Sequence, residues 1–144
     1  MEVSLRLAEH VRRKQLGNVF AAETGFRIGR DPDTVLASDV SFVRKERLAV
    51  TGITDEYYPE APAFVVEVVS PGDTAEEVDD KMRRWFAAAV ELGWVMYPKG
   101  RTVTVYRGLD DIRVLAADDI LDGGLVVPDF TCRVGDLFSA LGRK

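Results

Sequence analysis

The sequence has 144 residues, a formal net charge of −5 and 47% apolar residues, an ordinary balance for a globular protein with one hydrophobic core. This length suits one domain, which we expect to span residues 1–144. The one cysteine, Cys132, excludes an intramolecular disulfide, and no zinc cluster can be read from the chain. The acidic balance is not typical of a nucleic-acid-binding protein, but a local patch or a bound cation can offset acidic groups at one site.

The N-terminal segment MEVSLRLAEHVRRKQ is charged and amphipathic. It has no apolar central region and no small-residue cleavage site, so it does not resemble a signal peptide. No apolar run approaches the length of a membrane span. The sequence therefore predicts a cytoplasmic protein without a membrane partner.

The first half of the chain predicts one helix and two strands. Apolar residues at helical spacing predict a helix over residues 3–16, which would leave His10 exposed. A strand over 19–28, broken near Gly25, and a second strand over 36–43 follow, the latter from its alternation of apolar and polar residues. The charged and Pro-rich residues 44–62 are expected to form a connecting loop.

The second half predicts a strand, a helix and a hairpin. Residues 63–69 are almost continuously apolar, which is typical of a central strand that is covered on both faces. A T-x-x-E capping box then begins a helix that is expected to reach about Glu91, where Gly93 stops it. Residues 94–107 predict a hairpin, residues 112–132 two or three short strands, and residues 134–141 a closing helix.

This order of elements predicts an α/β (α+β) fold. Its core would run α-β-β-β-α-β, with a mixed central sheet flanked by helices and a β-rich C-terminal tail. A strand, a helix and another strand in succession indicate a crossover connection within that sheet.

Glu67 is the most informative residue, because it is a carboxylate within an otherwise apolar strand. Burial of an unpaired charge at this position would be very costly. Alternation places Glu67 on the same face as Val65 and Val69. A structural role remains an equal alternative, with Glu67 at a sheet edge or paired with an arginine inside the protein.

Asp39 is a second carboxylate, on the predicted strand before it. If the strands over 36–43 and 63–69 are neighbours, Asp39 and Glu67 can lie about 5 Å apart on one face. Two carboxylates that close repel each other unless a cation lies between them, and oxygen ligands suit Mg²⁺ or Mn²⁺. Taken alone, Asp39 would more simply serve a turn or a helix cap.

Lys81 falls at the border of the apolar face of the following helix. A lysine there usually extends into solvent. It can instead lean over the sheet toward the two carboxylates, where its charge would favour their ionised forms and hold a phosphate or an attacking water.

These residues resemble the Uma2 family, also called DUF820, whose members are endonucleases of the restriction-endonuclease-like PD-(D/E)XK superfamily. The resemblance covers roughly residues 18–107 in order. It rests on three blocks, which are Asp39-Val-Ser-Phe-Val, Pro62-Ala-Phe-Val-Val-Glu67-Val-Val-Ser70-Pro71 followed by Lys81, and Trp94-Val-Met-Tyr-Pro98.

The resemblance implies that Asp39 and Glu67 are metal ligands. The superfamily commonly places a lysine two residues after the second acid, where this chain has Val69. In Uma2-like sequences the basic role moves to the following helix, which indicates Lys81. Glu23 matches an acidic position upstream and is an accessory candidate on the preceding strand.

Two further positions depart from the family pattern and leave the acidic pair intact. Ser38 stands where a proline is usual before Asp39, and Tyr97 stands where an aspartate is usual before Pro98.

The first hypothesis is therefore a Mg²⁺-dependent endonuclease acting on DNA, with Asp39, Glu67 and the backbone carbonyl of Val68 as metal ligands and Lys81 as the catalytic base-orienting or charge-stabilising residue. By analogy, a homodimer would supply two sites for cutting two strands. A catalytically inactive nuclease-fold module that binds nucleic acid or protein is the second hypothesis, and a plain interaction protein with a structurally paired Glu67 is the third.

Overall fold

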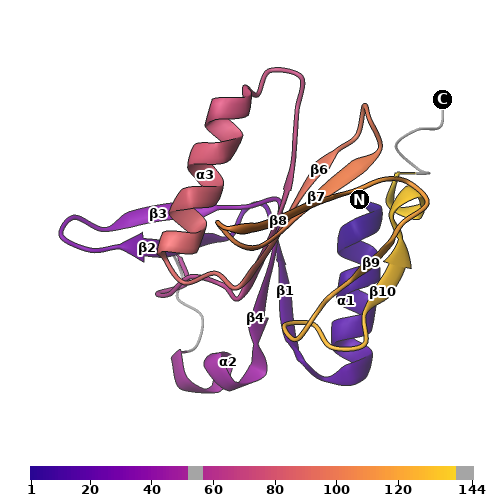
Figure 1. Cartoon of the computed structure of the whole chain (residues 1–144). Coiled ribbons are helices and arrows are strands. Elements are labelled where there is room, and N and C mark those ends of the chain that lie inside the picture. The colour runs from indigo at the N-terminus through magenta and orange to yellow at the C-terminus, as the bar shows by residue number, and fades with distance from the viewer. Residues whose placement is uncertain (52–56, 139–144) are drawn as a thin grey trace.

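The structure, a computed structural model, describes residues 1–51 and 57–138 (Figure 1). Its helical elements are α1 (Glu2–Lys14), α2 (Lys45–Thr51), α3 (Ala75–Ala87) and the 3-10 turn η1 (Val134–Leu137). Its strands are β1 (Gly17–Ala21), β2 (Gly25–Gly29), β3 (Thr34–Ala37), β4 (Val40–Arg44), β5 (Phe64–Val68), β6 (Leu92–Tyr97), β7 (Thr102–Gly108), β8 (Asp111–Leu115), β9 (Ile120–Asp122) and β10 (Thr131–Arg133).

A six-stranded mixed sheet forms the centre of the fold, in the order β1-β4-β5-β6-β7-β8. Strands β5 and β6 are parallel and are joined through α3, whereas the other neighbours are antiparallel. In Figure 1, α3 and the β2–β3 hairpin lie to one side of this sheet, and α1 with β9 and β10 lies to the other. The predicted fold class, a mixed sheet flanked by helices with a β-rich tail, is confirmed.

Both faces of β5 are buried, which explains its almost unbroken apolar sequence. Phe64 and Val66 contact the cluster that includes residues of α1, β9 and β10, and Val65 contacts the cluster that includes Met82 and Trp85 of α3. Glu67 follows Val65 in alternation, so its side chain points to the α3 side of the sheet.

The segment predicted as one strand over residues 36–43 divides into β3 and β4. Strand β3 pairs with β2 in a separate two-stranded sheet, whereas β4 joins the main sheet. The division falls at Ser38-Asp39, where the buried Ser38 hydroxyl donates to the carbonyl of Val40 at 2.7 Å and lies 2.6 Å from the hydroxyl of Ser41. These hydrogen bonds stabilise a bend in place of a continuous strand.

The residues after β4 and after α3 also differ from the prediction. Residues 45–51 form α2 rather than a loop, consistent with a run of good helix formers, and residues 52–56 of the predicted loop lie outside the described part. Helix α3 ends at Ala87, because Ala89 adopts a φ of 78° and turns the chain into β6. Gly93 lies within β6, where a side chain would meet Met82 of α3.

The C-terminal tail forms the three short strands β8, β9 and β10. The predicted closing helix is only a 3-10 turn within the described residues, and residues 139–141 lie outside them. Cys132 is buried in the core. No helix in the described ranges combines the length and the apolar character needed to cross a bilayer.

The prediction that His10 is exposed is wrong. Its side chain is buried between α1 and the tail, with Nε2 at 2.8 Å from the carbonyl of Pro128. The imidazole also packs edge-on against Phe130, with 5.5 Å between the ring centroids. His10 therefore has a structural role in joining α1 to the residues before β10.

Candidate active site

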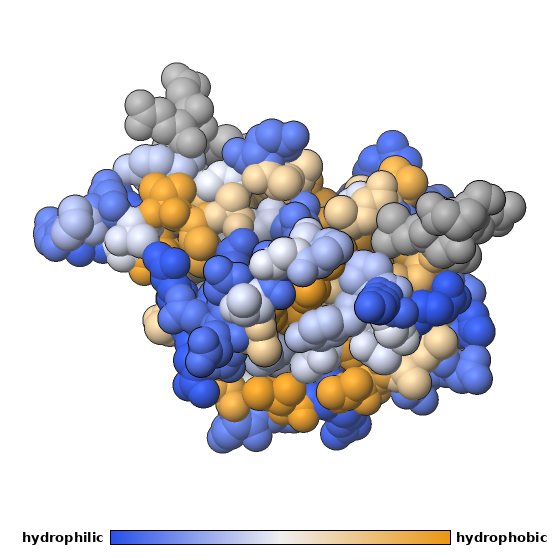
Figure 2. Space-filling view, turned by 90° about the horizontal axis from the view of Figure 1, so that it is seen from above, coloured by the Kyte–Doolittle hydropathy of each residue, from blue (hydrophilic) through white to orange (hydrophobic). Residues whose placement is uncertain are grey.

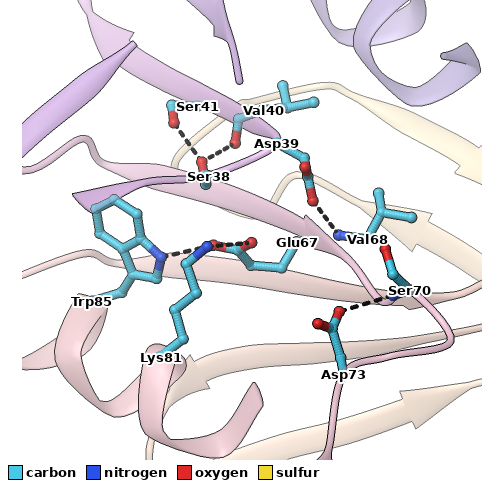
Figure 3. A network of polar contacts seen from close by, with 10 residues as sticks. All are labelled: Ser38, Asp39, Val40, Ser41, Glu67, Val68, Ser70, Asp73, Lys81 and Trp85. Atoms are coloured by element: carbon cyan, nitrogen blue, oxygen red, sulfur yellow. Dashed lines mark hydrogen bonds and ion pairs between the residues drawn. The ribbon is translucent and has the colours of Figure 1, made fainter. Parts of the chain in front are cut away.

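The carboxylates of Asp39 and Glu67 belong to neighbouring chain segments at the C-terminal end of β5 (Figure 3). Strands β4 and β5 are antiparallel with Val40 opposite Val66, so continuing the register by one residue places Asp39 opposite Glu67. The backbone N–H of Val68 donates to Oδ2 of Asp39 at 2.7 Å. This bond fixes Asp39 against the end of the central strand.

Glu67 is only 8% exposed, and both of its carboxylate oxygens accept hydrogen bonds. Nζ of Lys81 lies 3.1 Å from Oε1, and Nε1 of Trp85 lies 2.9 Å from Oε2 (Figure 3). Glu67 is not at a sheet edge, and no arginine of residues 1–51 and 57–138 pairs with it. Its charge is instead balanced by a lysine and fixed in direction by an indole, which are two donors from one helix.

Burial raises the pKa of Glu67 above its ordinary value, and the neighbouring Asp39 adds to this effect. Lys81 and Trp85 act in the opposite direction without cancelling the effect of burial. The carboxylate therefore holds its proton more strongly than an exposed glutamate does. A positive charge placed between Asp39 and Glu67 would favour the ionised form of both.

The raised pKa of Glu67 predicts how stability depends on pH. Between the ordinary value of 4.5 and the raised value, the folded protein binds more protons than the unfolded chain, so the free energy of unfolding falls as the pH rises through this window. We expect the wild type to lose stability relative to Glu67→Gln over this range. Urea denaturation of both proteins in EDTA at a series of pH values tests this, and a pH-independent difference would contradict it.

Lys81 reaches the site from the second turn of α3. The helix begins with the predicted capping box, in which the N–H of Glu77 donates to the Thr74 hydroxyl at 3.1 Å and the N–H of Thr74 donates to the Glu77 carboxylate at 2.9 Å. The side chain of Lys81 is 35% exposed and leans over the sheet rather than extending into solvent. Its ammonium therefore contacts Glu67 and remains accessible from outside.

Trp85 is a functional candidate that the sequence pattern did not reveal. Its large ring is fully buried, and an aromatic residue at helical spacing is usually part of the core. The one usable signal is its position four residues after Lys81, because residues at this spacing lie on the same face of a helix. Both side chains consequently reach the same carboxylate.

Trp85→Phe is expected to cost about 1.5–3 kcal/mol of stability more than the matched change Trp94→Phe, because a hydrogen bond to a charged group is worth about this much. Trp94 is also fully buried, but its indole N–H has no hydrogen-bond partner in the described part of the chain. Urea denaturation at neutral pH measures the difference. Equal losses would show that the Trp85 N–H does not stabilise Glu67.

A pocket of about 260 Å³ opens beside Glu67 and Lys81. Its wall includes two further acids, Asp73 and Glu77, that already have structural roles. Asp73 accepts from the N–H of Ser70 at 2.9 Å, and Glu77 belongs to the capping box. Viewed from above, this face of the molecule is mostly hydrophilic, and apolar side chains form several separate patches on it (Figure 2).

The donors at the site fit a hard divalent cation. Across residues 1–51 and 57–138, no group of three or more His, Cys, Asp or Glu side chains is placed to hold a metal by itself. The available donors are the carboxylates of Asp39 and Glu67 and backbone oxygen, an all-oxygen set. A carboxylate has about four acceptor positions, so the two hydrogen bonds to Glu67 leave room for a cation.

Two other positions of the family pattern, Glu23 and Val69, lie outside the contacts of Glu67 described above. Glu23 is not on a strand but in the exposed turn after β1, although the pairing of Ala21 with Val40 puts that turn at the same end of the sheet as Asp39. Val69, at the usual lysine position, packs against the α3-side core cluster, and its N–H donates to Met96.

The fold and the carboxylates at the end of its central strand define an α/β protein of the nuclease-like class. A family model described as "Putative restriction endonuclease" matches residues 2–135, and the chain belongs to this family, Uma2. The match spans the main sheet and every residue of the candidate site.

A crystal structure of a "putative nuclease belonging to DUF820" from Anabaena variabilis ATCC 29413 is similar to this chain with a TM-score of 0.83. The two share 20% sequence identity, and the similarity covers 97% of this chain and 78% of the other. At this identity the likeness shows a shared fold. A search of curated proteins found no match.

Proposed function

We propose that this protein is a metal-dependent endonuclease that hydrolyses phosphodiester bonds of DNA. The observation that carries the proposal is the meeting of Asp39 and Glu67 at the end of β5, with the ammonium of Lys81 at 3.1 Å from Glu67. Membership of the Uma2 family and the nuclease-like fold support it.

In this proposal Asp39, Glu67 and the backbone carbonyl of Val68 hold Mg²⁺ or Mn²⁺. A bound divalent cation polarises a scissile phosphate and lowers the pKa of a coordinated water. Acidic ligands together with a cation also account for how a chain of net charge −5 meets a phosphate at this place.

The chain's own residues position the reaction. Lys81, exposed on the side of the pocket, orients the attacking water or stabilises the charge that develops on the phosphate. Trp85 donates to the other oxygen of Glu67 and fixes the orientation of the carboxylate. Glu23, in the turn at the same end of the sheet, is an accessory ligand in this proposal.

Incubation of the purified protein with supercoiled plasmid tests the proposal. We expect nicked or linear DNA with Mg²⁺ or Mn²⁺ and none with EDTA. A parallel incubation with RNA distinguishes the two kinds of substrate. Absence of cleavage of either substrate with every divalent cation, together with no metal binding by calorimetry, would overturn the proposal.

A homodimer is part of the proposal, because cutting both strands of a duplex needs two sites. Strand β8 is an edge of the main sheet and exposes Ile112 by 48% and Val114 by 65%. Pairing of β8 with its copy would satisfy the open backbone edge and place both side chains next to those of the copy. Light scattering should therefore give twice the mass of the chain, and Val114→Lys should return it to the mass of one chain.

A catalytically inactive nuclease-fold module is the second candidate function. Two observations favour it: Val69 occupies the usual lysine position, and Lys81 is already paired with Glu67. Such a module would bind duplex DNA or a protein partner without cleaving any substrate. Binding of a labelled duplex that stays intact in Mg²⁺ and Mn²⁺ would identify it.

A further inference from the structure

A second pocket, of about 420 Å³, lies at the opposite end of β5 from Glu67. It opens where β4 ends at Arg44, where the chain enters β5 at Ala63 and where Glu91 precedes β6. Ala63 and Glu67 are four residues apart, which is about 13 Å along a strand. No residue of this pocket lines the pocket beside Glu67, so the two are separate sites.

Four arginines line this pocket, from four different segments of the chain. They are Arg27 of β2, Arg30 of the turn after β2, Arg44 of β4 and Arg47 of α2. Among the described residues, the lining holds two acids, Glu60 and Glu91, so the described lining carries a formal excess of two positive charges in a chain of net charge −5. This concentration of guanidinium groups is the reverse of the overall charge of the protein.

Ion pairs hold three of these arginines in place, and Arg27 lies 3.8 Å from a carboxylate oxygen of Asp33. Arg44 donates to both oxygens of Glu91, at 2.6 and 2.9 Å, and Arg47 pairs with Glu60. A guanidinium has five N–H donors, so the two bonds to Glu91 leave three on Arg44. Its side chain is 33% exposed, and Arg30 is exposed. Pre-oriented guanidinium groups match the oxygens of a phosphate in a bidentate arrangement.

We propose that this arginine pocket binds a phosphate-bearing anion, independently of the carboxylate site. Its volume lies within the range of about 300–1,000 Å³ that is typical of small-molecule sites. Small or apolar residues, including Pro62, Ala63 and Ala88, form much of the remaining wall and leave space for an apolar group next to the phosphate. A mononucleotide and the end of a nucleic-acid strand both carry a phosphate next to a less polar group.

Calorimetric titration of the full chain with inorganic phosphate and with AMP tests the proposal. We expect one AMP per chain, bound about tenfold more weakly by Arg30→Ala and by Arg44→Lys, since charge-assisted hydrogen bonds are the strong ones. Arg44→Lys keeps the positive charge but removes the planar guanidinium that can donate two parallel hydrogen bonds. Arg30→Ala changes only an exposed side chain. Arg12→Ala on α1, also exposed, is the matched control and should bind as the wild type does.

Anisotropy titration of a labelled duplex in EDTA forms the second arm. A loss of duplex affinity in the pocket variants, without an effect on AMP, assigns the phosphate to nucleic acid. A loss of AMP affinity alone assigns it to a small ligand. Equal affinities of the wild type, Arg30→Ala and Arg44→Lys for every probe, or no binding of any probe, would overturn the proposal. Neither arm depends on cleavage.

Discussion

Glu67→Gln is expected to lower the rate of DNA cleavage by about 10³-fold or more while the protein remains folded. The amide has nearly the same volume but no negative charge, so it is a poor ligand for a divalent cation. Burial disfavours the charged form of Glu67 and so raises its pKa. An uncharged amide at this position does not carry that cost, and therefore the fold should persist. Plasmid cleavage under single-turnover conditions and calorimetric titration with Mn²⁺ measure the two effects.

Glu9→Gln is the matched control for this change, since Glu9 is an exposed glutamate on α1, on the other side of the main sheet. It should cleave and bind metal as the wild type does. Asp39→Asn should reproduce the loss of metal binding, because Asp39 is the other proposed ligand. Retained cleavage in Glu67→Gln would remove Glu67 from the reaction and leave it as a structurally paired acid.

Lys81→Met is expected to lower the cleavage rate by about 10²–10³-fold, the effect of losing one group that stabilises developing charge. Methionine keeps most of the apolar stem that packs along α3 and removes only the ammonium. The variant should still bind duplex DNA in Ca²⁺. Lys14→Met, which removes a half-exposed lysine on α1, is the control and should leave the rate unchanged.

A pH profile separates a direct role of Lys81 from an indirect one. Lys81 lowers the pKa of Glu67, so its removal raises that pKa further. If Lys81 acts only through Glu67, a higher pH ionises the carboxylate and restores the rate of Lys81→Met. If Lys81 contacts the water or phosphate, the rate stays low at every pH. Full recovery at high pH would therefore exclude the proposed direct role.

The positions of Asp39 and Glu67 were predictable from two properties of the sequence, which are the cost of burying a charge and the alternation of side chains along a strand. An acid inside an apolar strand needs partners, and alternation fixes the face on which it lies. Glu67 proved to be a buried acid opposite Asp39, and Lys81 leans toward it from the border of the apolar face of α3. These placements follow from local periodicity together with the pairing of two adjacent strands.

Other features depended on tertiary contacts that a sequence pattern does not reveal. An indole that donates to a buried acid has the same sequence spacing as any aromatic residue of the core. The spacing of Trp85 therefore does not indicate its hydrogen bond to Glu67. His10 is buried because a distant carbonyl, that of Pro128, lies beside α1. The end of α3 is set by the left-handed Ala89 rather than by Gly93, whose small size allows close packing against Met82.

The bend at Ser38-Asp39 has a mechanical consequence. Asp39 is the residue through which the chain leaves the β2–β3 ribbon and enters the main sheet, so its backbone belongs to neither sheet. On the side of the main sheet, Asp39 is held in register with β5 by the hydrogen bond from Val68 and by the one between Ser38 and Ser41. On the other side it is joined through a single residue, Ser38, to a hairpin. The hairpin also contacts the other side of the site, because the ring of its buried Phe26 lies 6.4 Å, between centroids, from the ring of Trp85, the indole that donates to Glu67. Its packing is therefore connected to the positions of both carboxylates, through Ser38 to Asp39 and through Phe26 and Trp85 to Glu67.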